Sequence, residues 1–325
     1  WRVLQRASPA ASRGEALAAL EVWSFNLRTE SQDLADGQDG WSQRRGGVAE
    51  LLARRLPALV CVQEATRPML DFLVARLGGR YRAVATSRTP GAEDETAGFL
   101  YDASALDLED HRATWLGPPG CAPGDACWDA MYPRTFEAAL FRVRGAEALP
   151  AGGLRPFAPR LRALNTHLDH EGQSARRHSA GMLAEAVRRA VAEAPGAAQV
   201  LCGDFNSPKG GGNEVYRILA GEAGLRDAAR EAAEVDLAPS TIHKFQGPAF
   251  ASRRGDGTVE LAGDPGEEED ASHIDWILWR DGSGAGGASL RPRRCEVVTE
   301  ALASGRYPSD HFPVSATFEL RCAEG

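Results

Sequence analysis

Six short polar motifs, each beside or within an apolar run, carry the residues of this chain that could do chemistry. Five follow a predicted strand directly, and the sixth, His273-Ile274-Asp275-Trp276, places an acid within one. Acids and amides at the ends of buried strands are costly unless they are paired or bind a metal. Six of them therefore indicate one pocket where strand ends converge. The other five motifs are Phe25–Arg28, Val62–Glu64, Asn165–His170, Gly203–Asn206 and Ser309–His311.

The side chains in these motifs are mostly hard oxygen donors, which suit Mg²⁺ or Mn²⁺. These donors are Asn26, Glu64, Asp204, Asn206, Asp275 and Asp310. Two histidines, His167 and His311, could act on a phosphate or on a water. The sequence holds no nucleophile elbow and no P-loop. This set indicates metal-assisted attack of water on a phosphate ester.

Apolar periodicity predicts the elements that must position these motifs. Residues Glu21–Leu27 alternate with period two, as a strand does, and Gln173–Ala194 repeat at three and four, as a helix does. Strand-rich stretches separated by a few helices favour an α/β sandwich over a strict βαβ repeat. The other expected strands span 58–63, 81–86, 98–101, 136–144, 161–166, 199–202, 274–279, 295–299 and 314–320, and the other helices 42–56 and 68–77.

Length and charge limit the number of domains and the class of function. The 325 residues, 43% of them hydrophobic, allow one large or two ordinary domains, and the net charge of -8 disfavours holding nucleic acid by positive charge alone. Since residues from Asn26 to His311 must share one pocket, we expect an N-terminal tail at 1–19 and one monomeric domain at 20–325. Loops are expected at Gly255–Asp270 and Gly282–Gly287. No stretch approaches the roughly 20 apolar residues of a membrane span.

The six cysteines fall into two kinds. Cys61 and Cys202 lie inside apolar runs, where free core thiols are expected. Two further pairings, Cys121–Cys127 across a short Pro/Gly loop and Cys295–Cys322 beside the last two strands, suit disulfides. Such bridges predict a secreted or extracytoplasmic protein, with a cytoplasmic one left open. The N-terminus shows no signal peptide, and a leader removed before Trp1 is also left open.

The motifs, taken in order, resemble the endonuclease/exonuclease/phosphatase (DNase I-like) superfamily over about residues 20 to 320. The most specific feature is Gly203-Asp204-Phe205-Asn206 paired with a late Ser309-Asp310-His311. Finer signs, such as Asp39-Gly40-Trp41 with Arg44-Arg45, are similar to a little-characterised, mainly microbial branch. The resemblance implies a four-layer α/β sandwich in which two central mixed β-sheets are flanked by helices.

The resemblance also implies roles for the strand-end residues. Glu64 would be the main Mg²⁺ or Mn²⁺ ligand with Asn26 beside it, and Asp310 would be a second ligand to metal or water. Asp204 and Asn206 would align or deprotonate the attacking water and hold the phosphate. A surface ion pair for Glu64, a turn cap for Asn26 and a purely structural turn at Asp204 are the plainer alternatives.

The histidines and one arginine complete the expected site. His311 resembles the catalytic histidine, and Asp275 the acid that orients it and raises its pKa. His167 resembles a donor to a scissile phosphate oxygen. Expected substrate contacts come from Arg134, His170 and His243, with Asp169 in support.

A divalent-metal phosphodiesterase of endonuclease type is the leading functional hypothesis. A phosphomonoesterase, or a lipid- or sugar-phosphate phosphodiesterase of the same fold, is the alternative. A catalytically degenerate binding protein, or a zinc hydrolase built on His167, Asp169 and His170, is a more distant one. Arginines at 176–177 and at 291, 293 and 294 form either a nucleic-acid surface or solvated faces.

Overall fold

The computed structural model describes residues 16–146, 158–210, 212–248, 273–283 and 287–322. Within these ranges no helix is long and apolar enough to cross a bilayer. The expected loop at Gly255–Asp270 lies outside the described residues, as does most of the expected tail. The first strand begins at Ala18, so the expected boundary at residue 20 falls inside it.

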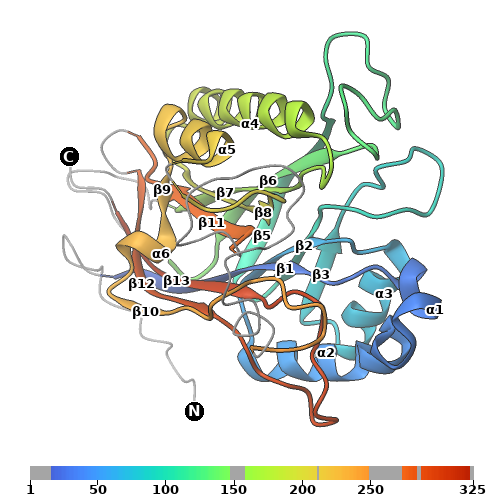
Figure 1. The fold of residues 1–325 in the computed structure, drawn as a ribbon. Coiled ribbons are helices and arrows are strands. Elements are labelled where there is room, and N and C mark those ends of the chain that lie inside the picture. The colour runs from blue at the N-terminus through green and yellow to red at the C-terminus, as the bar shows by residue number, and fades with distance from the viewer. Residues whose placement is uncertain (1–15, 147–157, 211, 249–272, 284–286, 323–325) are drawn as a thin grey trace, which may run out of the picture.

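Two mixed β-sheets face each other at the centre of the fold (Figure 1). The first runs in the order β10 (Glu234–Asp236), β12 (Ala288–Val297), β13 (Val314–Cys322), β1 (Ala18–Asn26), β2 (Leu59–Gln63), β4 (Phe99–Asp102), β3 (Tyr81–Val84). The second runs β5 (Leu106–Trp115), β6 (Thr135–Val143), β7 (Arg160–His167), β8 (Ala198–Asp204), β11 (Asp275–Arg280), β9 (Arg226–Asp227). Only β1–β2, β7–β8 and β10–β12 pair in parallel among these strands.

Helices cover both outer faces and complete four layers, as expected (Figure 1). The first sheet carries α2 (Trp41–Arg55) and α3 (Arg67–Arg76), and the second carries α4 (Gln173–Glu193), α5 (Glu214–Tyr216) and the π-helical turn η3 (Arg217–Glu222). Shorter turns are η1 (Glu30–Gln32), α1 (Asp33–Asp36), η2 (Gly37–Asp39) and α6 (Ala228–Glu231).

Period-two alternation explains how one strand serves two cores. In β1, Val22 joins the core between the sheets, while Trp23 and Phe25 pack on the other face with α2 and α3. The helix α3 begins where Thr66 Oγ1 accepts from the Met69 amide, with a proline in its first turn. These packed faces fix the direction of each strand, and so the place where its last residue emerges.

The two expected disulfides have different outcomes. Cys121 and Cys127 are bonded, but Cys295 and Cys322 are free, so the second pairing was wrong. In the β12–β13 ladder Cys295 lies opposite Ala316, whereas Cys322 lies opposite Ala288. That register separates the two cysteines by about 20 Å at about 3.3 Å per residue, far beyond disulfide reach.

Candidate active site

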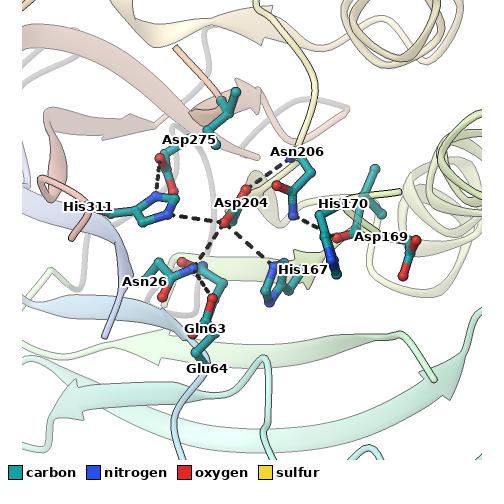
Figure 2. A network of polar contacts seen from close by, with 12 residues as sticks. Asn26, Gln63, Glu64, His167, Asp169, His170, Asp204, Asn206, Asp275 and His311 are labelled. Atoms are coloured by element: carbon teal, nitrogen blue, oxygen red, sulfur yellow. Dashed lines mark hydrogen bonds and ion pairs between the residues drawn. The ribbon is translucent and has the colours of Figure 1, made fainter. Parts of the chain in front are cut away.

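The carboxyl ends of β1, β2 and β8 meet at the edge where the two sheets face each other. Asn26 ends β1 and donates through Nδ2 to Glu64 Oε1 (2.9 Å) and to Asp204 Oδ2 (3.0 Å), as Figure 2 shows. Glu64 directly follows β2 and has a left-handed backbone (φ 55°), which turns its side chain to this junction. One amide therefore joins carboxylates that belong to different sheets.

His311 and Asp275 form a buried pair beside Asp204. His311 Nδ1 lies 2.9 Å from Asp275 Oδ2, and His311 Nε2 lies 3.8 Å from Asp204 Oδ2 (Figure 2). Burial alone would lower the pKa of His311, but the charges of Asp275 and Asp204 outweigh it and raise that pKa well above its usual range. The imidazole is therefore a cation at neutral pH, and both ring nitrogens are donors.

His167 ends β7 on the other side of Asp204, and its pKa is shifted in the other direction. Its Nε2 lies 3.6 Å from Asp204 Oδ2. Burial, and then the nearby charges of Arg134 and Arg88, hold the pKa of His167 well below its usual range. His167 is therefore neutral at pH 7 and can donate only one ring proton.

Asp204 lies between these two rings, at the end of β8. Burial, followed by the charge of Asp275, raises the pKa of Asp204 to about 7, against the opposing charge of His311. Its Oδ1 accepts from the backbone amide of Asn206 (3.0 Å), whose left-handed backbone (φ 45°) forms a tight turn. The Asn206 side chain donates to the Leu168 carbonyl (3.0 Å), which holds it across the mouth of the β7–β8 pair.

The carboxylates crowd together as a hard cation site would require. Oxygen and nitrogen donors of Glu64, His167 and Asp204 lie within 4.8 Å of one another. Burial would raise the pKa of Glu64, but the Asn26 amide, His311 and Arg28 lower it; burial raises the pKa of Asp310. Burial and the neighbouring carboxylate disfavour a second negative charge at Asp310, which a bound cation would offset. The donor set therefore fits Mg²⁺ or Mn²⁺, whose preferred ligands are carboxylate and amide oxygens.

Asp310 lies on the loop before β13, on the β1 side of the site. Its Oδ2 is 3.7 Å from Arg28, which also pairs with Asp36 (3.0 Å). Its backbone carbonyl accepts from the amides of His243 and Lys244. Asp310 is thus anchored near Glu64, whose charge helps to raise the pKa of Asp310.

Of the three expected substrate contacts, Arg134 lies close enough to His167 for its charge to lower the pKa of that histidine. Asp169 accepts from Arg134 Nε (3.3 Å), and Arg134 Nη2 lies 3.1 Å from His170 Nδ1. The His170 ring is 40% exposed and stacks on Tyr132 at the rim. Figure 2 shows Asp169 and His170 beside His167, away from Asp204.

His243 lies beside the Asp310–His311 segment, where its amide donates to the Asp310 carbonyl (2.8 Å). Its ring is 0% exposed and stacks on Phe312 with centroids 3.7 Å apart. Gly247 N donates to its Nδ1 (3.1 Å). Burial lowers the pKa of His243 to about 3, so the ring is neutral. A ring with no exposed surface does not line the site, and its position supports packing rather than substrate contact.

Sequence reasoning missed the residues that support the site from behind. Gln63 donates to Asn165 Oδ1 (2.7 Å) and so joins β2 to β7 across the two sheets. Arg44, 2% exposed, donates to the carbonyls of Leu27, Arg28 and Pro308. Both stood inside quoted motifs, but their partners are far away in sequence, so no local spacing pointed to these contacts.

Comparison with known proteins identifies the fold that carries this site. No protein-family model and no curated protein matches the chain. The endonuclease/exonuclease/phosphatase from Bacteroides vulgatus has a TM-score of 0.72 at 24% identity, over 93% of this chain and 99% of that one. The mannosyl-6-phosphatase from Bacteroides thetaiotaomicron gives 0.70 at 23%, over 92% and 99%. The catalytic domain of human nocturnin with bound sulfate gives 0.58 at 17%, over 93% and 94%. The chain therefore has the DNase I-like fold of the endonuclease/exonuclease/phosphatase superfamily, as its strand-end motifs predicted.

Proposed function

We propose that this protein is a divalent-metal-dependent hydrolase of phosphate esters, of phosphodiesterase type. The single observation that carries the proposal is the arrangement around Asp204. A carboxylate with a pKa of about 7 lies between a charged histidine, His311, and a neutral one, His167. A base with a pKa close to the working pH, flanked by two different proton donors, suits attack of water on a phosphate.

Glu64 and Asn26, with Asp310 next to them, would hold Mg²⁺ or Mn²⁺. The bound cation would supply Lewis-acid stabilisation of the charge on a phosphoryl oxygen. The carboxylates of Glu64 and Asp204 are already close, because both accept from Asn26 Nδ2, while Asn26 Oδ1 accepts from the Arg28 amide (2.9 Å). An ordered donor set lowers the reorganisation needed when charge develops.

The protein's own side chains would then act as the base and as the two proton donors. Asp204 would orient the attacking water and accept its proton. His311, held by Asp275, would donate to a phosphate oxygen as a cation, and His167 would donate as a neutral group. Asn206 would add a neutral contact at the turn that follows Asp204.

A small phosphate ester, including a monoester, is the second candidate, and the pairing of the surface arginines favours it. Arg294 lies 2.9 Å from Glu296, and Arg293 pairs with Glu319, so the charge of each is balanced by a neighbour. Arg176 is 3% exposed and donates to the Asp169 carbonyl (2.9 Å), so it is not part of the surface. With a net charge of -8, the chain has little to attract a polyanion over a long range.

A substrate panel tests the proposal and separates its two forms. The panel contains plasmid DNA, RNA, bis-p-nitrophenyl phosphate and p-nitrophenyl phosphate, each with Mg²⁺, with Mn²⁺ and with EDTA. We expect hydrolysis that EDTA abolishes, with the diester favoured if the enzyme is a phosphodiesterase. Hydrolysis of the monoester alone would favour the second candidate, and no EDTA-sensitive activity would reject both.

A further inference from the structure

Asp169 is a buried carboxylate on the turn that follows His167, and the mechanism proposed above gives it no task. Its Oδ1 accepts from the Gly172 amide (2.8 Å), where the chain turns into α4. Its Oδ2 accepts from the Met131 amide (3.1 Å) and from Arg134 Nε (3.3 Å), on the segment that leads into β6. The full set of donors to this carboxylate is the amides of Met131, Tyr132, Glu171 and Gly172 and Nε of Arg134.

The contact between Asp169 and Arg134 is a buried ion pair. Burial would raise the pKa of Asp169, but the Gly172 amide, the charge of Arg134 and the Met131 amide lower it, so the carboxylate is ionised at neutral pH. The side chain of Arg134 is 6% exposed and that of Asp169 1%. A carboxylate has two acceptor oxygens and an amide side chain only one, so asparagine at this position could not accept on both sides.

The guanidinium of Arg134 is fixed through two of its nitrogens. Nε donates to Asp169, and Nη2 lies 3.1 Å from His170 Nδ1. Within the described ranges of the chain, Nη1 has no hydrogen-bond partner. Arg134 and His167 line one cavity of about 10 Å³, which is room for about one water, so the two side chains are close neighbours. Arg134 therefore keeps a donor free beside a histidine of the site.

A second carboxylate, Asp129, anchors the same segment to α4 in a different way. Its Oδ1 accepts from the Ala175 amide (2.6 Å) and its Oδ2 from the Ser174 amide (3.1 Å), both in the first turn of the helix. Asp129 thus ties the segment to the helix through backbone amides alone, whereas Asp169 also pairs with Arg134. Anchoring of the segment and fixing of the guanidinium can therefore be tested separately.

Building on the proposed function, we propose that Asp169 is a positioning residue, which fixes Arg134 so that one guanidinium nitrogen is free to bind a phosphate oxygen of the substrate. A guanidinium donates charge-assisted hydrogen bonds to phosphate, and its planar shape sets the direction of each donor. A side chain that is already fixed loses little entropy when the ligand binds. Asp169 would act on the substrate only through Arg134.

Asp169→Asn tests this role, with Asp129→Asn as the matched control. KM and kcat are measured for bis-p-nitrophenyl phosphate with Mg²⁺. We expect KM to rise about tenfold or more in Asp169→Asn, because a misplaced Arg134 no longer binds the phosphate, and to stay at the wild-type value in Asp129→Asn. A segment that was merely loosened would lower the active fraction, and so kcat, and would leave KM unchanged.

The double variant Asp169→Asn/Arg134→Ala shows whether the two residues act as one unit. We expect Arg134→Ala to raise KM by a similar factor and the double variant to raise it no further, because Asp169 then has no guanidinium to position. KM increases that multiply in the double variant would overturn the proposal. A wild-type KM in folded Asp169→Asn would overturn it as well, and thermal melting shows which variants are folded.

Arg134→Lys keeps the proposal testable if Asp169→Asn does not fold. Lysine retains the charge beside Asp169 but has a single nitrogen, so it should pair with the carboxylate and lose the phosphate contact. We expect KM to rise about tenfold or more in this variant too. A wild-type KM in Arg134→Lys would contradict the proposed role of the free guanidinium nitrogen.

Binding of inorganic phosphate, measured by calorimetry, tests the same contact without turnover. We expect the Kd to rise about tenfold or more in Asp169→Asn and to be unchanged in Asp129→Asn. Equal phosphate affinity in wild type and Asp169→Asn would overturn the positioning role. Absence of EDTA-sensitive hydrolysis in wild type would instead reject the proposed function, while the calorimetry would still decide the role of Asp169.

Discussion

At the scale of single residues, the site is organised by the contrast between two histidines. His311 is charged because it faces Asp275 and Asp204, whereas His167 is neutral because it is buried near Arg134 and Arg88. The two rings approach the same oxygen, Asp204 Oδ2, His167 from the end of β7 and His311 from the loop before β13. Environment, and not residue type, therefore assigns each histidine its proton.

Asp275→Asn tests this assignment through the pH dependence of kcat/KM. The raised pKa of His311 means that its charged form is lost as pH rises through that pKa, which gives the alkaline limb of the profile. Removing the charge of Asp275 lowers this pKa, so we expect the alkaline limb to move to lower pH. We also expect kcat/KM to fall by about 10²-fold or more.

Asp110→Asn, on the outer strand β5, is the matched control and should keep both the rate and the profile. An alkaline limb that stays in place in Asp275→Asn would show that His311 is not the group that sets it.

At the scale of elements, the sequence was informative wherever a strand is buried on one or both faces. The strands that end in site residues, β1, β2, β7 and β8, were predicted within a few residues, because their apolar patterns are continuous or alternate. The strand β5 (Leu106–Trp115) was missed, since only Leu106 is fully buried and charged residues interrupt it. An edge strand needs little apolar surface, so pattern alone does not reveal it.

Cysteine chemistry gives an element-scale prediction. Denatured, unreduced protein should present four reactive thiols, from Cys61, Cys202, Cys295 and Cys322, and six after reduction. A thiol-reactive chromophore in guanidinium chloride measures both numbers. Two thiols before reduction would instead support a second bridge, and six would show that Cys121 and Cys127 are not bonded.

The buried ring of His243 predicts a pH-dependent stability. Its folded pKa of about 3 lies below the unfolded value of about 6.5, so the unfolded chain binds a proton that the folded chain excludes. Stability is thus lost as pH falls from 6.5 toward 3, by up to about 1.4 kcal/mol per pH unit from this residue.

His243→Gln should be less stable than wild type at pH 7.5, because it loses the stacking on Phe312. The difference between the free energies of unfolding of wild type and His243→Gln should shrink as pH falls to 4. Urea unfolding at each pH measures the free energies. A difference that stays constant over this range would contradict a neutral, buried His243.

At the scale of the whole molecule, the site exists because two sheets meet. Asn26 and Glu64 come from one sheet and His167, Asp204 and Asp275 from the other, with Gln63–Asn165 joining them below. The sequence predicted which of these side chains lie together, since strand-end motifs are local, and their roles stay predictions. It could not predict the contacts of Arg44 or Gln63, because these depend on segments that only the packed sheets bring together. The carboxylates clustered here contribute part of the net charge of -8 and would belong to the proposed cation site.

The central claim is metal-dependent hydrolysis centred on Asp204, and one rate comparison tests it most directly. Hydrolysis of bis-p-nitrophenyl phosphate is followed at pH 8 with Mg²⁺ or Mn²⁺ for wild type and for Asp204→Asn, with Asp110→Asn as the control. We expect an EDTA-sensitive rate in wild type and control, and a loss of about 10³-fold or more in a folded Asp204→Asn. Full activity in folded Asp204→Asn would contradict the account.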